Sequence, residues 1–77
     1  MLSEDDFVDR VAAELGISRR ELTAGTFEAL GFDSLQMYEL DLIVEELGAL
    51  VSDEDIVSAR SIHDLYEAYR RTIAKAD

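Results

Sequence analysis

The chain has 77 residues, 48% of them hydrophobic, with 18 acidic residues against seven basic ones and no cysteine. A chain of this length is expected to form one domain, residues 1–77, whose small core leaves no room for a deep catalytic cleft. Its hydrophobic content excludes a disordered acidic tail, and its net charge of −11 disfavours nucleic acid and anionic lipid as partners. With no cysteine and a single histidine, the sequence predicts neither a disulfide nor a metal site.

The sequence carries no recognisable targeting signal. Its N-terminus, MLSEDDFVDR, begins with acids and lacks the basic start and the apolar core of a signal peptide. No apolar run approaches the length needed to cross a bilayer. We therefore expect a soluble, cytoplasmic monomer that does not bind membranes.

The charge is unevenly distributed along the chain. Between Arg20 and Arg60 there is no Lys or Arg, although the segment contains ten acids: Glu21, Glu28, Asp33, Glu39, Asp41, Glu45, Glu46, Asp53, Glu54 and Asp55. Such a segment forgoes internal ion pairs, which favours an external partner with a basic surface. The simpler alternative is a solvated face that keeps the protein soluble.

Hydrophobic periodicity predicts helices in the N-terminal half of the chain. The first is expected from about Ser3 to Leu15, with Ser3 as its N-cap and Gly16 as the residue that ends it. Residues 16–33 contain three glycines and no long periodic run, so we expect a long loop with a brief helical turn at Ser18–Glu21. Apolar residues within this loop should hold it against the core.

The remainder of the sequence predicts three further helices. The second is expected over about Ser34–Leu47, and a short third helix over about Asp53–Ala59. The last begins after Ser61, and its apolar residues follow the spacing i, i+3, i+4, i+7 and i+11 from Ile62. The predicted fold class is therefore all-α: a small four-helix bundle with a long first loop and a short third helix.

The position of Ser34 raises a question of function. Serine at a helix start is most often an N-cap, which is the structural alternative here. Asp33 is an equally good cap and would leave the hydroxyl of Ser34 free at the first helical position, where the helix dipole stabilises a phosphate ester. A catalytic serine is disfavoured, because no Gly-x-Ser-x-Gly elbow surrounds Ser34 and a triad would depend on His63, which is more simply an exposed residue.

Three segments together resemble acyl carrier proteins and the related peptidyl carrier domains. LGFDSLQMYEL, residues 30–40, is similar to their attachment motif of Leu-Gly, a variable residue, Asp-Ser-Leu and then Glu-Leu. LGALVSDED is similar to the end of the family's second helix and the entry to its third, and ARSIHDLYEAY to the start of its last helix. The resemblance covers nearly the whole chain and agrees with the predicted bundle.

The resemblance implies a carrier rather than an enzyme. Ser34 would receive a 4′-phosphopantetheine arm from coenzyme A, and the thiol of the arm would hold an acyl or aminoacyl group as a thioester. Asp33 would flank the attachment site and aid recognition by the transferase, while Leu35 and Met37 would supply apolar contacts beside the arm. The residues expected to meet partner proteins are Met37, Glu39, Asp41, Glu45 and Glu46. The implied partners are a phosphopantetheinyl transferase, a loading enzyme (an acyltransferase or an adenylating ligase) and a ketosynthase or other biosynthetic enzymes.

Several residues depart from the usual pattern of the family, namely Phe32, Tyr38, Tyr66, Tyr69 and Ser52, the last of which replaces a common Pro. The simpler interpretation of the four aromatic residues is a repacked core, and the functional one is a differently shaped pocket for an unusual cargo. The departures favour a discrete carrier of polyketide or nonribosomal biosynthesis over one of fatty-acid synthesis. The alternative from another class is an acidic helical adaptor that is never modified, which leaves Asp33-Ser34-Leu35 unexplained.

Overall fold

The computed structural model describes residues 1–76 and is helical throughout, with no strand in that range. Its helices are α1 (Glu4–Leu15), α2 (Arg19–Thr23), α3 (Ser34–Glu46), α4 (Asp53–Ser58) and α5 (Ile62–Ala76). The predicted all-α bundle is confirmed, and the predicted helices end within one residue or so of the observed ones. The brief turn expected at Ser18–Glu21 is a five-residue helix, α2, so the described part of the chain has five helices rather than four.

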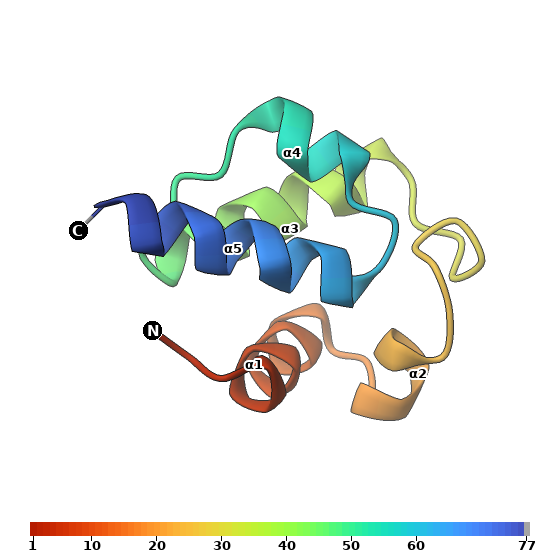
Figure 1. Ribbon diagram of the computed structural model, residues 1–77. Coiled ribbons are helices and arrows are strands. Elements are labelled where there is room, and N and C mark those ends of the chain that lie inside the picture. The colour runs from red at the N-terminus through yellow and green to blue at the C-terminus, as the bar shows by residue number, and fades with distance from the viewer. Residues whose placement is uncertain (77) are drawn as a thin grey trace.

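The helices pack around α5, which lies between α1 and α4 and contacts both (Figure 1). α3 lies behind α5 in this view and contacts α1 and α4, while α2 packs against α1. None of the helices in residues 1–76 is both long enough and apolar enough to span a membrane. The arrangement places the start of α3 and the short helix α4 at one side of the bundle, away from the crossing of α1 and α5.

Side-chain caps explain where the helices begin. The hydroxyls of Ser3, Ser18 and Ser52 each accept a hydrogen bond from a backbone N–H in the first turn of α1, α2 and α4. Gly16 follows α1 with φ of 71°, a left-handed conformation that favours glycine and allows its N–H to reach the last carbonyls of the helix. The predicted roles of Ser3 and Gly16 are confirmed.

The core is densest where α1 meets α5. Phe7 is fully buried, and its ring centroid lies 4.8 Å from that of Tyr69 and 5.3 Å from that of Tyr66. The hydroxyl of Tyr66 donates to the carbonyl of Leu2, and the N–H of Leu2 donates to the hydroxyl of Tyr69, both at 3.0 Å. The interpretation of these two tyrosines as core residues is therefore confirmed, and their hydroxyls tie the N-terminal segment to α5.

The long loop before α3 is held against the core, as predicted. Leu22 and Phe27 are buried, and the N–H of Phe27 donates to the carbonyl of Arg60 at 2.8 Å. The partly buried Phe32 stacks on Phe27 with their centroids 5.4 Å apart. The loop therefore enters α3 from a fixed position. Phe32 packs against the core, which was the simpler of the two interpretations given for it.

Candidate functional site

The segment before Ser34 makes a tight turn into α3. The N–H of Leu30 donates to the carbonyl of Thr26, and that of Phe32 donates to the carbonyl of Phe27, each at 3.0 Å. Gly31 has φ of 78°, which an L side chain rarely adopts, so the bend needs glycine at this position. The chain then reverses directly into the helix that begins at Ser34.

Asp33 rather than Ser34 caps α3. Its Oδ1 accepts from the N–H of Gln36 at 3.0 Å, and the side chain of Gln36 accepts in return from the N–H of Asp33 at 2.9 Å, which completes a capping box. Ser34 is thus the first helical residue, and its exposed hydroxyl makes no hydrogen bond within residues 1–76. The other serines at helix starts in this range use their hydroxyls as caps, so Ser34 differs from them in having its hydroxyl free.

Ser34 stands at the edge of an apolar groove of about 520 Å³ between α3 and α4. The groove is lined by Ser34, Met37, Tyr38, Asp41, Asp53, Ile56 and Val57. A second hollow of about 430 Å³ lies beyond Met37 and Val57 and is lined also by Phe27, Phe32 and Arg60. A flexible group attached to Ser34 would therefore find apolar surface directly beside it.

The interpretation of Tyr38 as a repacked core residue is wrong. Its side chain is 58% exposed and lines the groove next to Ser34. The reason is that α3 buries only one narrow stripe, formed by Leu40, Ile43 and Val44, so apolar residues elsewhere on the helix face outward. Leu35 and Leu42 are exposed for the same reason.

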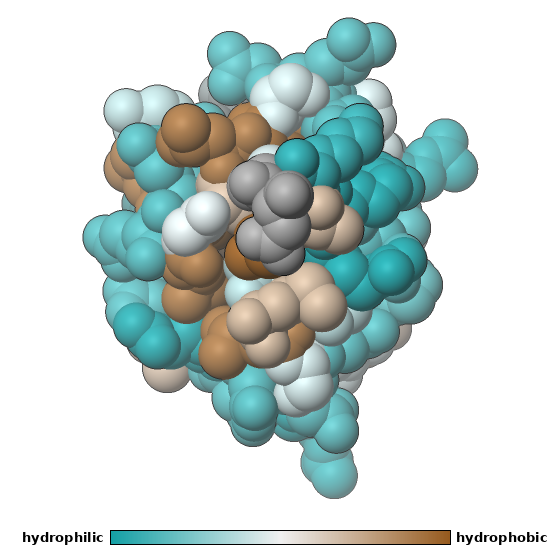
Figure 2. Space-filling model, turned by 60° about the vertical axis from the view of Figure 1, so that its left-hand side comes forward, coloured by the Kyte–Doolittle hydropathy of each residue, from teal (hydrophilic) through white to brown (hydrophobic). Residues whose placement is uncertain are grey.

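Apolar side chains also gather elsewhere on the surface. Figure 2 shows brown apolar patches bordered by teal hydrophilic residues on the face nearest the chain ends. The large hydrophobic residues with high exposure are Met1, Leu35, Tyr38, Leu42, Leu50 and Val57. Half of these lie on α3, which makes that helix the main source of exposed apolar surface around Ser34.

The acids of α3 have no internal counter-charge among the described residues. The ion pairs of residues 1–76 involve Arg10, Arg19, His63 and Arg70 with acids of α1 and α5. None involves an acid between residues 21 and 59, as the uneven charge of the sequence predicted. Asp41 is the one of these acids whose pKa is raised, first because burial in the groove disfavours its charge and then because Asp53 and Glu45 repel it.

The residues expected to meet partners fall on two faces of α3. Met37 and Asp41 line the groove with Ser34. Glu39 and Glu46 are exposed and share the spacing of Leu35 and Leu42, so these four form a second, outward face. Glu45 is exposed and lies near Asp41, so it belongs to the same side of α3 as Ser34 and the groove.

Sequence reasoning missed the groove residues Asp53 and Val57. They come from α4, on the far side of a loop from α3, and no short-range pattern connects them with Ser34. The one feature of the sequence that could have indicated them is the shortness of α4. A helix of this length buries only one face, so Val57 faces solvent.

The arrangement does not bring His63 to Ser34. The Nδ1 of His63 lies 2.9 Å from Oε2 of Glu4, on the side where α5 meets α1, and this hydrogen bond is the first cause of the raised pKa of His63. His63 is exposed, as expected, and no basic side chain contacts the hydroxyl of Ser34 within residues 1–76. The site therefore presents an exposed serine hydroxyl at the start of a helix, beside an apolar groove.

A comparison with models of protein families agrees with this geometry. Residues 5–69 match a family described as phosphopantetheine attachment site. No curated protein and no solved structure matched the chain. The matched range contains α2, α3 and α4 whole, with Ser34 near its centre.

Proposed function

Because the chain belongs to the phosphopantetheine attachment-site family, whose members carry 4′-phosphopantetheine covalently on a serine, we propose that Ser34 is that serine. The observation that carries the proposal is that Asp33 caps α3 and leaves the hydroxyl of Ser34 exposed. The protein is thus a phosphopantetheine-carrying carrier, and its attachment residue is the first residue of α3.

The start of α3 suits a phosphodiester. The N–H of Gln36 donates to the side chain of Asp33. The N–H groups of Ser34 and Leu35 belong to the first turn, where no carbonyl of the helix can accept from them, so they point out of the helix end. These groups and the helix dipole stabilise the negative charge of a phosphate on Oγ of Ser34. Attachment forms an oxygen–phosphorus bond at Ser34 and breaks the pyrophosphate bond of coenzyme A, whose nucleotide part leaves. The transferase accepts the hydroxyl proton, since no basic side chain within residues 1–76 contacts that hydroxyl.

The groove beside Ser34 supports a role in holding the arm and its cargo. Its volume of about 520 Å³ is in the range of small-molecule sites, and its walls are mainly apolar. Met37 and Tyr38 lie one turn along α3 from Ser34, so they are the first side chains that an arm folded into the groove would contact. Leu35 faces outward and would be available to a partner enzyme instead.

The acids of α3 support short encounters with basic enzymes. A carrier must leave each enzyme that it visits, and exposed ion pairs worth about 0–1 kcal/mol each steer association without slowing release. We propose that Glu39, Asp41, Glu45 and Glu46 meet Lys and Arg on the transferase, on a loading enzyme and on a ketosynthase or comparable enzyme. Leu35 and Leu42 would supply the apolar centre of the same interface.

We further propose a polyketide or nonribosomal pathway in the cytoplasm, with residues 1–77 acting as one monomeric carrier domain. The position of Tyr38 supports a cargo other than a plain acyl chain, because its exposed ring gives the groove an aromatic wall. The alternative within the family is a fatty-acid carrier. The adaptor alternative, an unmodified acidic protein, loses support because the family is defined by the attachment itself.

The test is modification in vitro. The apo protein is incubated with coenzyme A and a broad-specificity phosphopantetheinyl transferase, and its intact mass is measured. The wild type should gain one phosphopantetheine group and Ser34→Ala none, whereas Ser52→Ala, which removes the cap of α4, should be modified normally. An unmodified wild type, or a modified Ser34→Ala variant, would reject Ser34 as the attachment residue.

A second experiment addresses the pathway. The holo protein is recovered with its native loading enzyme, and the thioester is identified by mass spectrometry. A polyketide intermediate or an amino acid supports the proposed pathway, and a plain fatty acyl chain contradicts it.

A further inference from the structure

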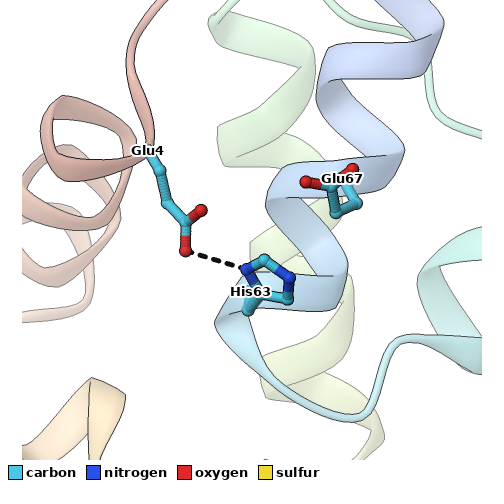
Figure 3. Close-up of side chains that lie close together, drawn as sticks. All are labelled: Glu4, His63 and Glu67. Carbon is cyan, nitrogen blue, oxygen red and sulfur yellow. Dashed lines mark hydrogen bonds and ion pairs between the residues drawn. The ribbon is translucent and has the colours of Figure 1, made fainter.

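Three potential metal ligands meet where α1 and α5 come together, outside the proposed carrier site. Glu4 is the first residue of α1, and His63 and Glu67 lie one turn apart on α5 (Figure 3). One carboxylate oxygen of each glutamate and one imidazole nitrogen all lie within 4.8 Å of one another. None of these residues has a role in the carrier function proposed above.

The donor set fits zinc better than it fits magnesium or calcium. Imidazole nitrogen and carboxylate oxygen are ordinary Zn²⁺ ligands, whereas Mg²⁺ and Ca²⁺ prefer shells made of oxygen alone. The spacing of His63 and Glu67, four residues apart on one helix, places both side chains on the same face. We propose that Glu4, His63 and Glu67 form a zinc site that joins α1 to α5, with water as the fourth ligand.

The geometry requires only small side-chain movements. Ligand bonds of about 2.0–2.2 Å in a tetrahedral shell put neighbouring ligand atoms about 3.3–3.5 Å apart. Glu4 and His63 already approach to 2.9 Å, and the remaining separations are at most 4.8 Å. The side chains of Glu4 and His63 are substantially exposed, so they can rotate and move their ligand atoms by about an ångström without disturbing the core.

Two existing contacts must change. Zinc takes the place of the proton in the Glu4–His63 hydrogen bond, and that proton is released to solvent. The second contact is shared. Arg70 donates to Oε2 of Glu67 at 2.7 Å, an i, i+3 pair on the surface of α5. A carboxylate has two oxygens, so Glu67 can keep this hydrogen bond through one and bind zinc through the other. Figure 3 shows the carboxylate of Glu67 on the same side of α5 as the ring of His63, with Glu4 reaching toward that ring from α1.

Zinc bound here would stabilise the folded bundle. The ligands come from opposite ends of the chain, with 59 positions between Glu4 and His63, so the unfolded chain does not hold them together. An ion that binds the native state alone raises the midpoint of unfolding with its concentration. The prediction of no metal site rested on the lack of cysteine and the single histidine, and ligands this far apart leave no local spacing that could have indicated the site.

The test titrates ZnCl₂ into the full-length apo protein, free of any polyhistidine tag, by isothermal calorimetry. The variants are His63→Gln, Glu67→Gln and the control Glu14→Gln, which removes a carboxylate of α1 as exposed as that of Glu4, with 43% of each side chain accessible. We expect one Zn²⁺ per chain, an affinity at least tenfold lower in His63→Gln and in Glu67→Gln, and no change in Glu14→Gln. Saturating zinc should raise the Tm of the wild type by about 5 °C and leave that of His63→Gln unchanged.

NMR separates this site from the acids of α3 and α4. One equivalent of zinc should shift the ring resonances of His63, and the same amount of Mg²⁺ should not. The proposal is overturned if no zinc binds at millimolar concentration, if either variant binds as the wild type does, or if the His63 ring is unaffected while zinc binds. Since attachment at Ser34 is measured separately, failure here would leave the carrier function standing.

Discussion

The two sides of this bundle use the same kinds of residue in opposite ways. Where α1 meets α5, aromatic rings are buried around Phe7, and several acids of α1 have basic partners, Arg19 of α2 and His63 of α5. Along α3 and α4, an aromatic ring, Tyr38, stands exposed beside a groove, and the acids have no partner among the described residues. In a chain this small, satisfied charges and covered rings mark the side that keeps the fold stable. Unpaired acids and an exposed ring mark the side that we propose meets other molecules.

The largest effect should come from the buried side. Phe7→Ala removes a fully buried ring that contacts Tyr66 and Tyr69, and should lower the free energy of unfolding by about 3–5 kcal/mol. The matched change on the other side is Val57→Ala, which removes an exposed side chain of α4 and should cost less than about 0.5 kcal/mol. Urea denaturation measures both, and equal costs would remove the distinction between the two sides.

Charge reversal should affect function on the α3 side alone. Glu39→Lys combined with Glu46→Lys should lower kcat/KM of the phosphopantetheinyl transferase by about tenfold, because the encounter loses its electrostatic steering. Asp6→Lys with Glu14→Lys changes the net charge equally on α1 and should change kcat/KM by less than about twofold. The difference should shrink in high salt. Equal losses from both pairs would mean that net charge, not the α3 face, guides the enzyme.

A smaller effect is expected from the hydroxyl of Tyr69. Tyr69→Phe leaves the N–H of Leu2 without its acceptor and should cost about 1 kcal/mol in urea denaturation. Tyr38→Phe removes a hydroxyl from an exposed ring and should leave stability unchanged. If Tyr38→Phe proved the more costly of the two, Tyr38 would belong to the structural side.

The smallest effect should be the pH dependence due to Asp41. Its pKa in the folded protein is raised by burial and by Asp53 and Glu45, so the protonated carboxyl favours folding and that stability is lost as the pH rises through the folded pKa. At pH 7 the ionised Asp41 therefore opposes folding, and Asp41→Asn should raise the Tm by about 2 °C. At pH 3, below the ordinary carboxyl pKa, the gain should vanish. A gain of the same size at both values would show that it has no electrostatic origin.

The sequence predicted the helices and the free hydroxyl of Ser34 because both depend on residues close together in the chain. Serine caps, Gly16 and the spacing of apolar residues set the helix ends, and the pair Asp33-Ser34 needs only its own turn. Tyr38 was misread because periodicity identifies an apolar residue without saying whether another element covers it. Groove residues on α4 and the meeting of Glu4 with His63 depend on tertiary packing, which no local pattern encodes.

The central claim is that Ser34 is set apart from the serines that cap helices. The direct measurement is fragmentation mass spectrometry of the modified wild-type protein, which locates the phosphopantetheine group among the six serines of the chain. All of the added mass should lie on Ser34, because the hydroxyls of the other five make hydrogen bonds to the backbone. Modification at any capping serine, or none at Ser34, would contradict the account.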